Sequence, residues 1–160
     1  MARVAIKKPL SHALQPDELR AVEEFKRRLI AELPGQVKDI ILFGSKARGD
    51  AHPGSDIDLL VVVDRRTPEV DDIISEITAD TLLEQRIDIS ALDFTTDQIA
   101  ELAAIGTPFI RNVADEGIVL KGGPIVVGKG DPAKVAQGFI ESAHGRLRSA
   151  RAVREIGEYG

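Results

Sequence analysis

Two aspartates separated by one residue, Asp56 and Asp58, open an apolar stretch and are the clearest candidates for chemistry in this 160-residue chain. Because side chains alternate along an extended strand, both carboxylates would point to the same face of a sheet. Two neighbouring carboxylates at the start of a buried strand repel each other and lose solvation. A divalent cation relieves both costs, so the pair predicts a metal site.

A small-residue turn, Gly44-Ser45, lies ten residues before this pair and directly follows another apolar stretch. Its backbone N–H groups and the Ser45 hydroxyl could bind phosphate. Lys46 and Arg48 come just after the turn and could stabilise negative charge on a departing pyrophosphate. A phosphate-binding turn beside paired carboxylates predicts nucleotide chemistry.

A third carboxylate, Asp88, lies in residues 86–92, whose strict alternation predicts a strand with one polar face. Three carboxylates on neighbouring strands are typical of phosphoryl or nucleotidyl transfer with two Mg²⁺ ions roughly 3.5–4 Å apart. In that hypothesis Asp56 and Asp58 hold the metal of the nucleotide and share the second metal. Asp88 completes the second metal site and could accept the proton of the attacking hydroxyl. Each motif alone is more often a plain turn or a solvated strand end, but the combination favours the functional interpretation.

The elements that must position these residues follow from the hydrophobic pattern. It predicts an α/β (α+β) chain in which residues 1–13 are poorly fixed and residues 14–123 form one domain, followed by a linker at 124–130 and a C-terminal amphipathic helical tail at 131–160. The predicted strands are 37–43, 56–63, 86–92 and 117–120. The predicted helices are 16–33, a short one near 46–49, one that opens at 67–69 and has apolar positions through 83, one that begins at 95 or 96 and runs through 103, a turn at 108–114, and 132–156.

Composition limits the partners of the chain. Residues 1–123 carry 15 basic and 22 acidic side chains, a balance of −7, which argues against an extended nucleic-acid footprint. Residues 124–160 carry six basic and four acidic side chains, a balance of +2. The chain has no cysteine, no signal-peptide core and no apolar run of membrane-spanning length, so we expect a cytoplasmic protein that binds no membrane.

The motifs around the candidate site resemble the minimal nucleotidyltransferases of the DNA polymerase beta superfamily. The signature of that superfamily is Gly-Ser, ten residues and Asp-x-Asp, which Gly44, Ser45, Asp56 and Asp58 match. Asp88 matches the third carboxylate, and the resemblance covers residues 16–120. It implies a mixed β-sheet flanked by helices and Mg²⁺-dependent transfer of a nucleoside monophosphate, AMP from ATP, onto a hydroxyl. The family usually has arginine where this chain has Lys46, which keeps the charge but loses the planar fork.

Small bacterial members of this family often act as antitoxins of HEPN-type RNase toxins, some by transferring AMP to a toxin tyrosine. The resemblance therefore implies a HEPN-type toxin as the protein partner. An apolar stripe along the tail supports such a partner, and its end resembles the opening helix of a HEPN domain. The stripe consists of Val135, Phe139, Ala143, Leu147 and Ala150. Docking of this helix on a partner and packing of the helix on its own domain are both left open.

Two alternatives to a toxin-modifying enzyme also stay open. One is an adenylyltransferase for a small hydroxylated molecule such as an aminoglycoside, although about thirty residues after Gly123 are few for an acceptor-binding domain. A homo-oligomer could supply the rest of such a site. Another is a module that neutralises a toxin by binding alone, without catalysis.

Overall fold

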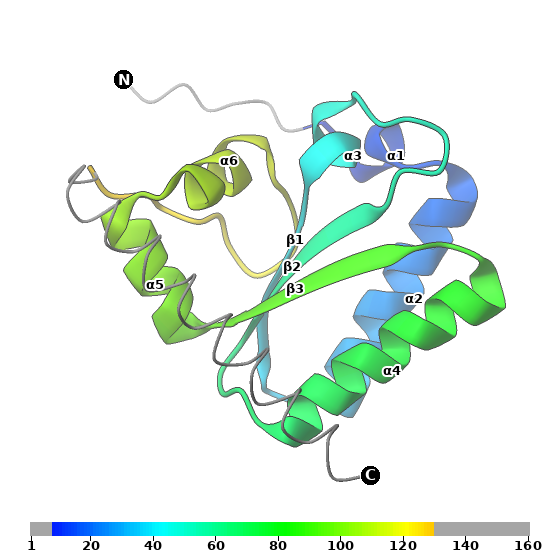
Figure 1. The fold of residues 1–160 in the computed structure, drawn as a ribbon, viewed down its shortest axis with the longest axis horizontal. Coiled ribbons are helices and arrows are strands. Elements are labelled where there is room, and N and C mark those ends of the chain that lie inside the picture. Colours follow the sequence, from blue (N-terminus) through cyan, green and yellow to red (C-terminus); the bar gives the residue numbers. More distant parts are fainter. Residues whose placement is uncertain (1–7, 130–160) are drawn as a thin grey trace, which may run out of the picture.

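The structure is a computed structural model and describes residues 8–129 of the chain. Helices and strands alternate along this part of the chain (Figure 1). The helices are α1 (Leu10–Ala13), α2 (Pro16–Glu32), α3 (Gly44–Arg48), α4 (Pro68–Gln85), α5 (Thr96–Ile105) and α6 (Pro108–Glu116). The strands are β1 (Val37–Phe43), β2 (Ile57–Val63), β3 (Ile89–Thr95) and β4 (Ile118–Lys121).

The strands form one mixed sheet in the order β3-β2-β1-β4. β1 pairs with β2 and with β4 in antiparallel orientation, whereas β2 and β3 are parallel. The parallel pair requires a crossover connection, which α4 supplies. The mixed sheet flanked by helices confirms the fold expected from the sequence.

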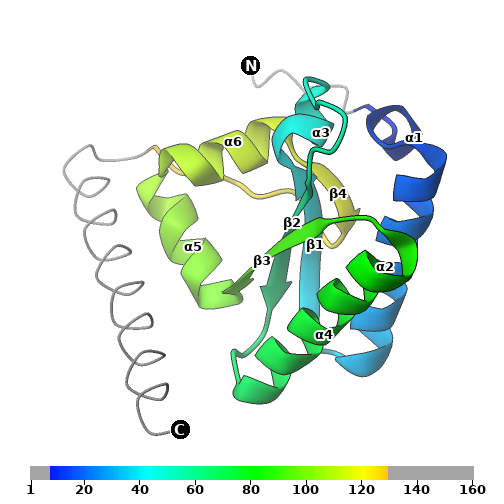
Figure 2. The same ribbon diagram turned by 45° about the vertical axis from the view of Figure 1, so that its right-hand side comes forward.

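Helices cover both faces of the sheet, α2 and α4 one face and α5 and α6 the other (Figures 1 and 2). Side chains of β2 alternate between two hydrophobic cores as a result. Leu59 and Val61 pack toward α2 and α4, in what we call the first core. Leu60 and Val62 pack toward α5 and α6, in the second core. This burial on both sides explains why residues 59–63 of β2 are an unbroken apolar run rather than an alternating one.

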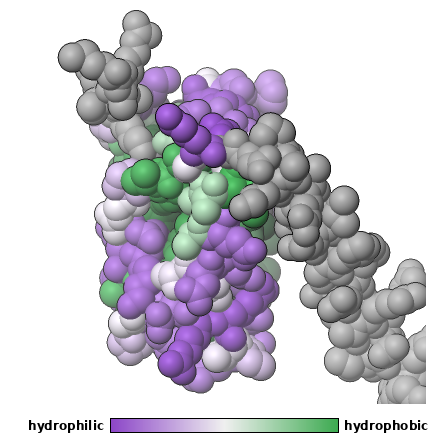
Figure 3. Space-filling view, turned by 90° about the vertical axis from the view of Figure 1, so that its left-hand side faces the viewer, coloured by the Kyte–Doolittle hydropathy of each residue, from purple (hydrophilic) through white to green (hydrophobic). Residues whose placement is uncertain are grey.

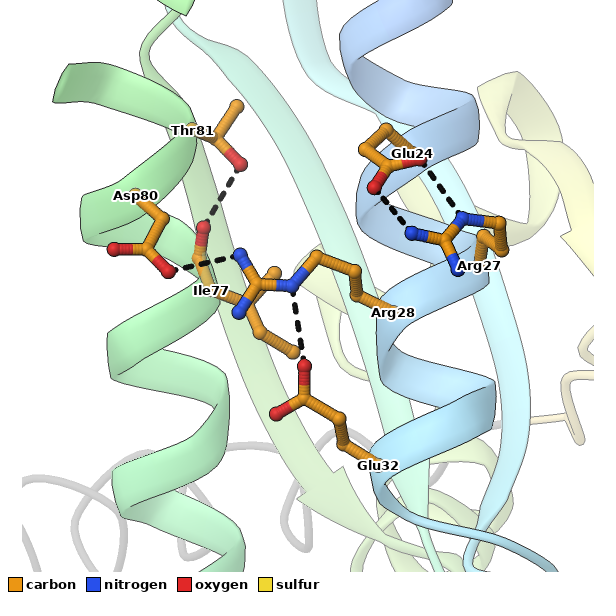
Figure 4. A network of polar contacts seen from close by, with 7 residues as sticks. All are labelled: Glu24, Arg27, Arg28, Glu32, Ile77, Asp80 and Thr81. Carbon is orange, nitrogen blue, oxygen red and sulfur yellow. Dashed lines mark hydrogen bonds and ion pairs between the residues drawn. The ribbon is translucent and has the colours of Figure 1, made fainter. Parts of the chain in front are cut away.

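Polar contacts join the two helices on the first face (Figure 4). Arg28 of α2 donates to Asp80 of α4 at 2.9 Å and to Glu32 of its own helix at 3.1 Å. The Thr81 hydroxyl donates to the carbonyl of Ile77 at 2.8 Å, so this buried polar group is satisfied within α4. The Asp80 carboxylate beside Arg28 raises the pKa of that guanidinium above its usual value.

Two elements differ from the sequence-based expectation. The third strand begins at Ile89 rather than at residue 86, because α4 continues to Gln85 and Arg86 ends it in the left-handed region at φ 56°. A short helix, α1, forms within the stretch expected to be poorly fixed, and Leu10 packs against the first core. The helix predicted at 132–156 lies outside the described residues.

The described part of the predicted linker, residues 124–129, has no helix or strand but is anchored to the domain. The N–H of Gly128 donates to the carbonyl of Ala103 in α5 at 2.8 Å. Ile125 and Val127 pack against the second core, and Val126 between them is 83 % exposed. Figure 3 shows this side of the molecule, where hydrophobic residues gather in the upper half. Among the residues that the structure describes, no helix is long and apolar enough to cross a membrane.

Candidate active site

Gly44 and Asp58 meet where β1 passes into α3. Phe43 pairs with Asp58 across the two antiparallel strands, so the turn that follows β1 lies beside the Asp58 side chain. Gly44 has a φ of 74°, which side chains rarely allow. A Cβ on Gly44 would overlap Asp58 Oδ2 and lie 3.1 Å from Asp58 Cγ. Glycine is therefore required at this position both by the backbone and by the close approach of the carboxylate.

Asp56 and Asp58 form the acidic pair that the sequence predicts. Asp58 shares its sheet face with Leu60 and Val62, which places it at the end of the face covered by α5 and α6. Burial and the neighbouring Asp56 carboxylate raise the pKa of Asp58, while the Arg48 guanidinium lowers it. The pair thus carries an electrostatic cost that a hard divalent cation would relieve, and its carboxylate oxygens are the donors that Mg²⁺ prefers.

The backbone of Asp88 lies beside the segment that carries Asp56 and Asp58. The parallel pairing of β2 and β3 aligns Ile57 with Ile89, and the N–H of Ile57 donates to the Asp88 carbonyl at 2.9 Å. Asp88 also lines a cavity of about 400 Å³ between α4 and β3. Within residues 8–129, no three His, Cys, Asp or Glu side chains are arranged so that they could hold a metal ion. The structure brings Asp56 and Asp58 together but does not bring the Asp88 carboxylate into a three-ligand cluster with them.

The first turn of α3 offers backbone donors beside the acidic pair. The first N–H groups of a helix have no partner within the helix, so the amides of Ser45 and Lys46 are available to an anion. The Ser45 carbonyl accepts the N–H groups of Gly49 and Asp50 at 2.9 and 3.1 Å. These bonds close the turn after α3 and leave Ser45 partly exposed. The Ser45 hydroxyl therefore stays a candidate phosphate ligand.

Lys46 lies in a different environment from the one the sequence suggests. Its side chain is only 10 % exposed, and its ammonium donates to Glu18 Oε1 of α2 at 2.5 Å. In this arrangement the charge of Lys46 faces Glu18 rather than open solvent. Sequence reasoning missed Glu18, which stands out only as an acidic residue in the first turn of a helix.

Arg48 lies between the acidic pair and α6. Its guanidinium donates to Glu116 and to Asp50, at 3.2 Å in each case. The Glu116 carboxylate, and then Asp50, raise the pKa of Arg48. Since Arg48 also lowers the pKa of Asp58, its positive charge is close enough to act on the site. Glu116 was missed by sequence reasoning because 68 residues separate it from Arg48.

A comparison with known proteins identifies the family of this chain. Residues 22–120 match the nucleotidyltransferase domain family. The match covers more than half of the chain and includes Gly44, Ser45, Asp56, Asp58 and Asp88. The chain belongs to this family and is a nucleotidyltransferase.

A relative from Methanocaldococcus jannaschii carries the name "Putative protein adenylyltransferase". It is 38 % identical over 105 residues, which are 65 % of this chain and 98 % of the relative.

Solved structures are similar at a lower level. A toxin–antitoxin complex with AMP-PNP is 17 % identical, with a TM-score of 0.43, and the match covers 84 % of this chain and 97 % of the other. A complex of a tri-AMPylated HEPN toxin with an MNT antitoxin from Shewanella oneidensis is 16 % identical, with a TM-score of 0.42, over 87 % and 96 % of the two chains. Neither ligand nor partner transfers to this chain from similarities of this size.

Proposed function

We propose that this protein is a Mg²⁺-dependent adenylyltransferase that moves AMP from ATP onto a hydroxyl group of a partner protein. One observation carries the proposal: the Asp58 carboxylate lies against Gly44 at the start of α3, with Asp56 beside it. This geometry puts the candidate cation ligands next to the candidate phosphate-binding turn. A nucleoside triphosphate with its cation has the charge distribution that such a site fits.

Each candidate site residue has its own role in the proposed transfer of AMP. Asp56 and Asp58 would hold Mg²⁺, which neutralises charge on the triphosphate when it is bound. The amides and hydroxyl of the Gly44–Ser45 turn bind the terminal phosphates, and Arg48 stabilises charge on the departing pyrophosphate. Asp88 would accept the proton of the attacking hydroxyl and would help to hold a second Mg²⁺ ion. The backbone bond between Ile57 and Asp88 keeps this segment beside the strand that carries Asp58.

A protein is the acceptor that fits the comparisons best, because the name of the Methanocaldococcus jannaschii relative describes a protein as its substrate. The resemblance of the signature to antitoxin nucleotidyltransferases makes the acceptor more specific. We assign it to a tyrosine of a HEPN-type toxin, which docks on the C-terminal segment 131–160. In this assignment the protein acts as an antitoxin.

The test uses labelled ATP, the purified protein and the product of the neighbouring gene. We expect label on the partner protein with Mg²⁺ and none with EDTA. Asp56→Asn and Asp58→Asn should each reduce the rate by at least about a hundredfold, since the substitution removes a charge that holds the cation. Asp64→Asn is the matched control, because Asp64 is exposed and follows the other end of β2.

Several outcomes would contradict the proposal. Labelling by Asp58→Asn at the wild-type rate would remove the acidic pair from the mechanism. Labelling of an added aminoglycoside, with an unlabelled partner protein, would replace the acceptor while keeping the chemistry. Neutralisation of a toxin without ATP binding would make the protein a binding module.

A further inference from the structure

The contact between Lys46 and Glu18 is the most buried ion pair among the described residues. The two side chains are 10 % and 14 % exposed, whereas in every other ion pair of residues 8–129 at least one side chain is more than a third exposed. Exposed ion pairs contribute little to stability, but removing one partner of a buried pair leaves an uncompensated charge. The Lys46–Glu18 pair therefore constrains its surroundings in a way that the surface pairs do not.

Glu18 links two elements through the two oxygens of one carboxylate. Its Oε2 accepts the N–H of Gln15 at 2.8 Å and so caps the first turn of α2. Its Oε1 accepts the ammonium of Lys46 in α3. α2 is packed along its length against the first core through Val22, Phe25 and Leu29. The carboxylate thereby ties the short helix α3 to a long, well-packed one.

We propose that Glu18 is a positioning residue of the nucleotide site. It holds Lys46, and through Lys46 it fixes the first turn of α3, where Gly44 lies against Asp58. α3 has only five residues, too few to keep its orientation by helix formation alone. Its orientation decides where the amides of the turn point, and a small misplacement of such donors is costly for binding and catalysis. This inference rests on the proposed function of the same site.

The opposite role for Lys46 makes a different prediction. If Lys46 left Glu18 to bind a phosphate directly, Glu18 would compete with ATP for the ammonium. Removing the charge of Glu18 would then strengthen ATP binding. If Glu18 positions α3, removing its charge weakens ATP binding, and removing Lys46 has no further effect once Glu18 is gone.

The test compares Glu18→Gln, Lys46→Met and the double variant in the full-length protein. Glutamine keeps an oxygen that can accept the Gln15 N–H, so the cap of α2 is preserved. We expect each single variant to weaken ATP binding in the presence of Mg²⁺ by about tenfold, and the double variant to be no weaker than the singles. Lys46→Arg keeps a cation opposite Glu18 and should retain wild-type affinity. Titration calorimetry measures the affinity.

Glu24→Gln is the matched control, since Glu24 lies on the same helix and pairs with Arg27 at the surface. Thermal melts monitored by circular dichroism restrict the comparison to temperatures at which each variant is folded. Wild-type or tighter ATP binding by folded Glu18→Gln, with an active wild-type protein, would overturn this inference alone. A wild-type protein that neither binds ATP nor transfers AMP would overturn the proposed function together with it.

Discussion

At the scale of single residues, the negative charge of Asp58 that would hold a cation also destabilises the fold. Burial and the Asp56 carboxylate raise its pKa, so the folded protein holds the proton of Asp58 more tightly than the unfolded chain does. The stability that this proton provides is fully present below the unfolded pKa of Asp58. It is lost as the pH rises through the higher pKa of the folded state. At neutral pH, without a cation, the charged carboxylate therefore destabilises the fold.

Asp58→Asn should consequently be more stable than the wild type at pH 7 in EDTA while it loses activity. We expect a gain of no more than about 1 kcal/mol in the free energy of unfolding, because the carboxylate stays partly solvated. The gain should disappear below the unfolded pKa, where the wild-type carboxyl is protonated. Urea denaturation at several pH values measures it. A variant less stable than the wild type at pH 7 would show that burial and repulsion do not dominate at Asp58.

At the scale of elements, α2 and α4 are joined across one sheet face by Arg28 and Asp80 (Figure 4). Arg28→Met keeps most of the apolar stem and removes the ion pair. We expect it to lower the free energy of unfolding by about 0.5 kcal/mol, with ATP binding unchanged, because the pair is only partly buried and lies away from the acidic pair. Thermal melts and ATP titrations check both parts.

Arg27→Met is the comparison for this prediction. Arg27 is 66 % exposed, and within residues 8–129 its ion pair is with Glu24 of its own helix, so this pair joins no second element of that part of the chain. Its substitution should affect stability less than Arg28→Met does. Equal effects of the two substitutions would mean that the contact between the helices adds nothing beyond a surface charge.

At the scale of the whole molecule, residues that follow the predicted end of the domain at Gly123 still contact the domain. Ile125 and Val127 pack against the second core although they follow the Gly122-Gly123-Pro124 break. A chain cut after Lys129 should fold and bind ATP like the full chain. A chain cut after Gly123 should lose about 1–2 kcal/mol of unfolding free energy, because it gives up two partly buried aliphatic side chains. Equal melting temperatures for the two truncations would place the domain boundary at Gly123 after all.

Sequence reasoning succeeded where local patterns decide the structure. β1 and the Gly-Ser turn follow from an apolar run and a glycine, and Thr67 caps α4 as its position before Pro68 suggests. It failed where contacts between residues that are distant in the sequence determine the structure. The partners of Lys46 and Arg48 come from α2 and α6, and no spacing in the chain links them. The start of β3 was set too early because the left-handed conformation of Arg86 has no strong sequence signal.

The strand order leaves β3 at one margin of the sheet, with Asp93 facing α4. One oxygen of Asp93 is buried 3.4 Å from Arg66 Nε and accepts no hydrogen bond from the described residues. The N–H and C=O groups of Ile89, Ala91 and Asp93 point outward, since their neighbours bond to β2. An incoming strand at this edge would pack beside the charged Asp93 and Arg66 side chains and would remove Arg66, which is half exposed, from water. Charged side chains beside this edge strand therefore disfavour edge-to-edge pairing between copies of the protein.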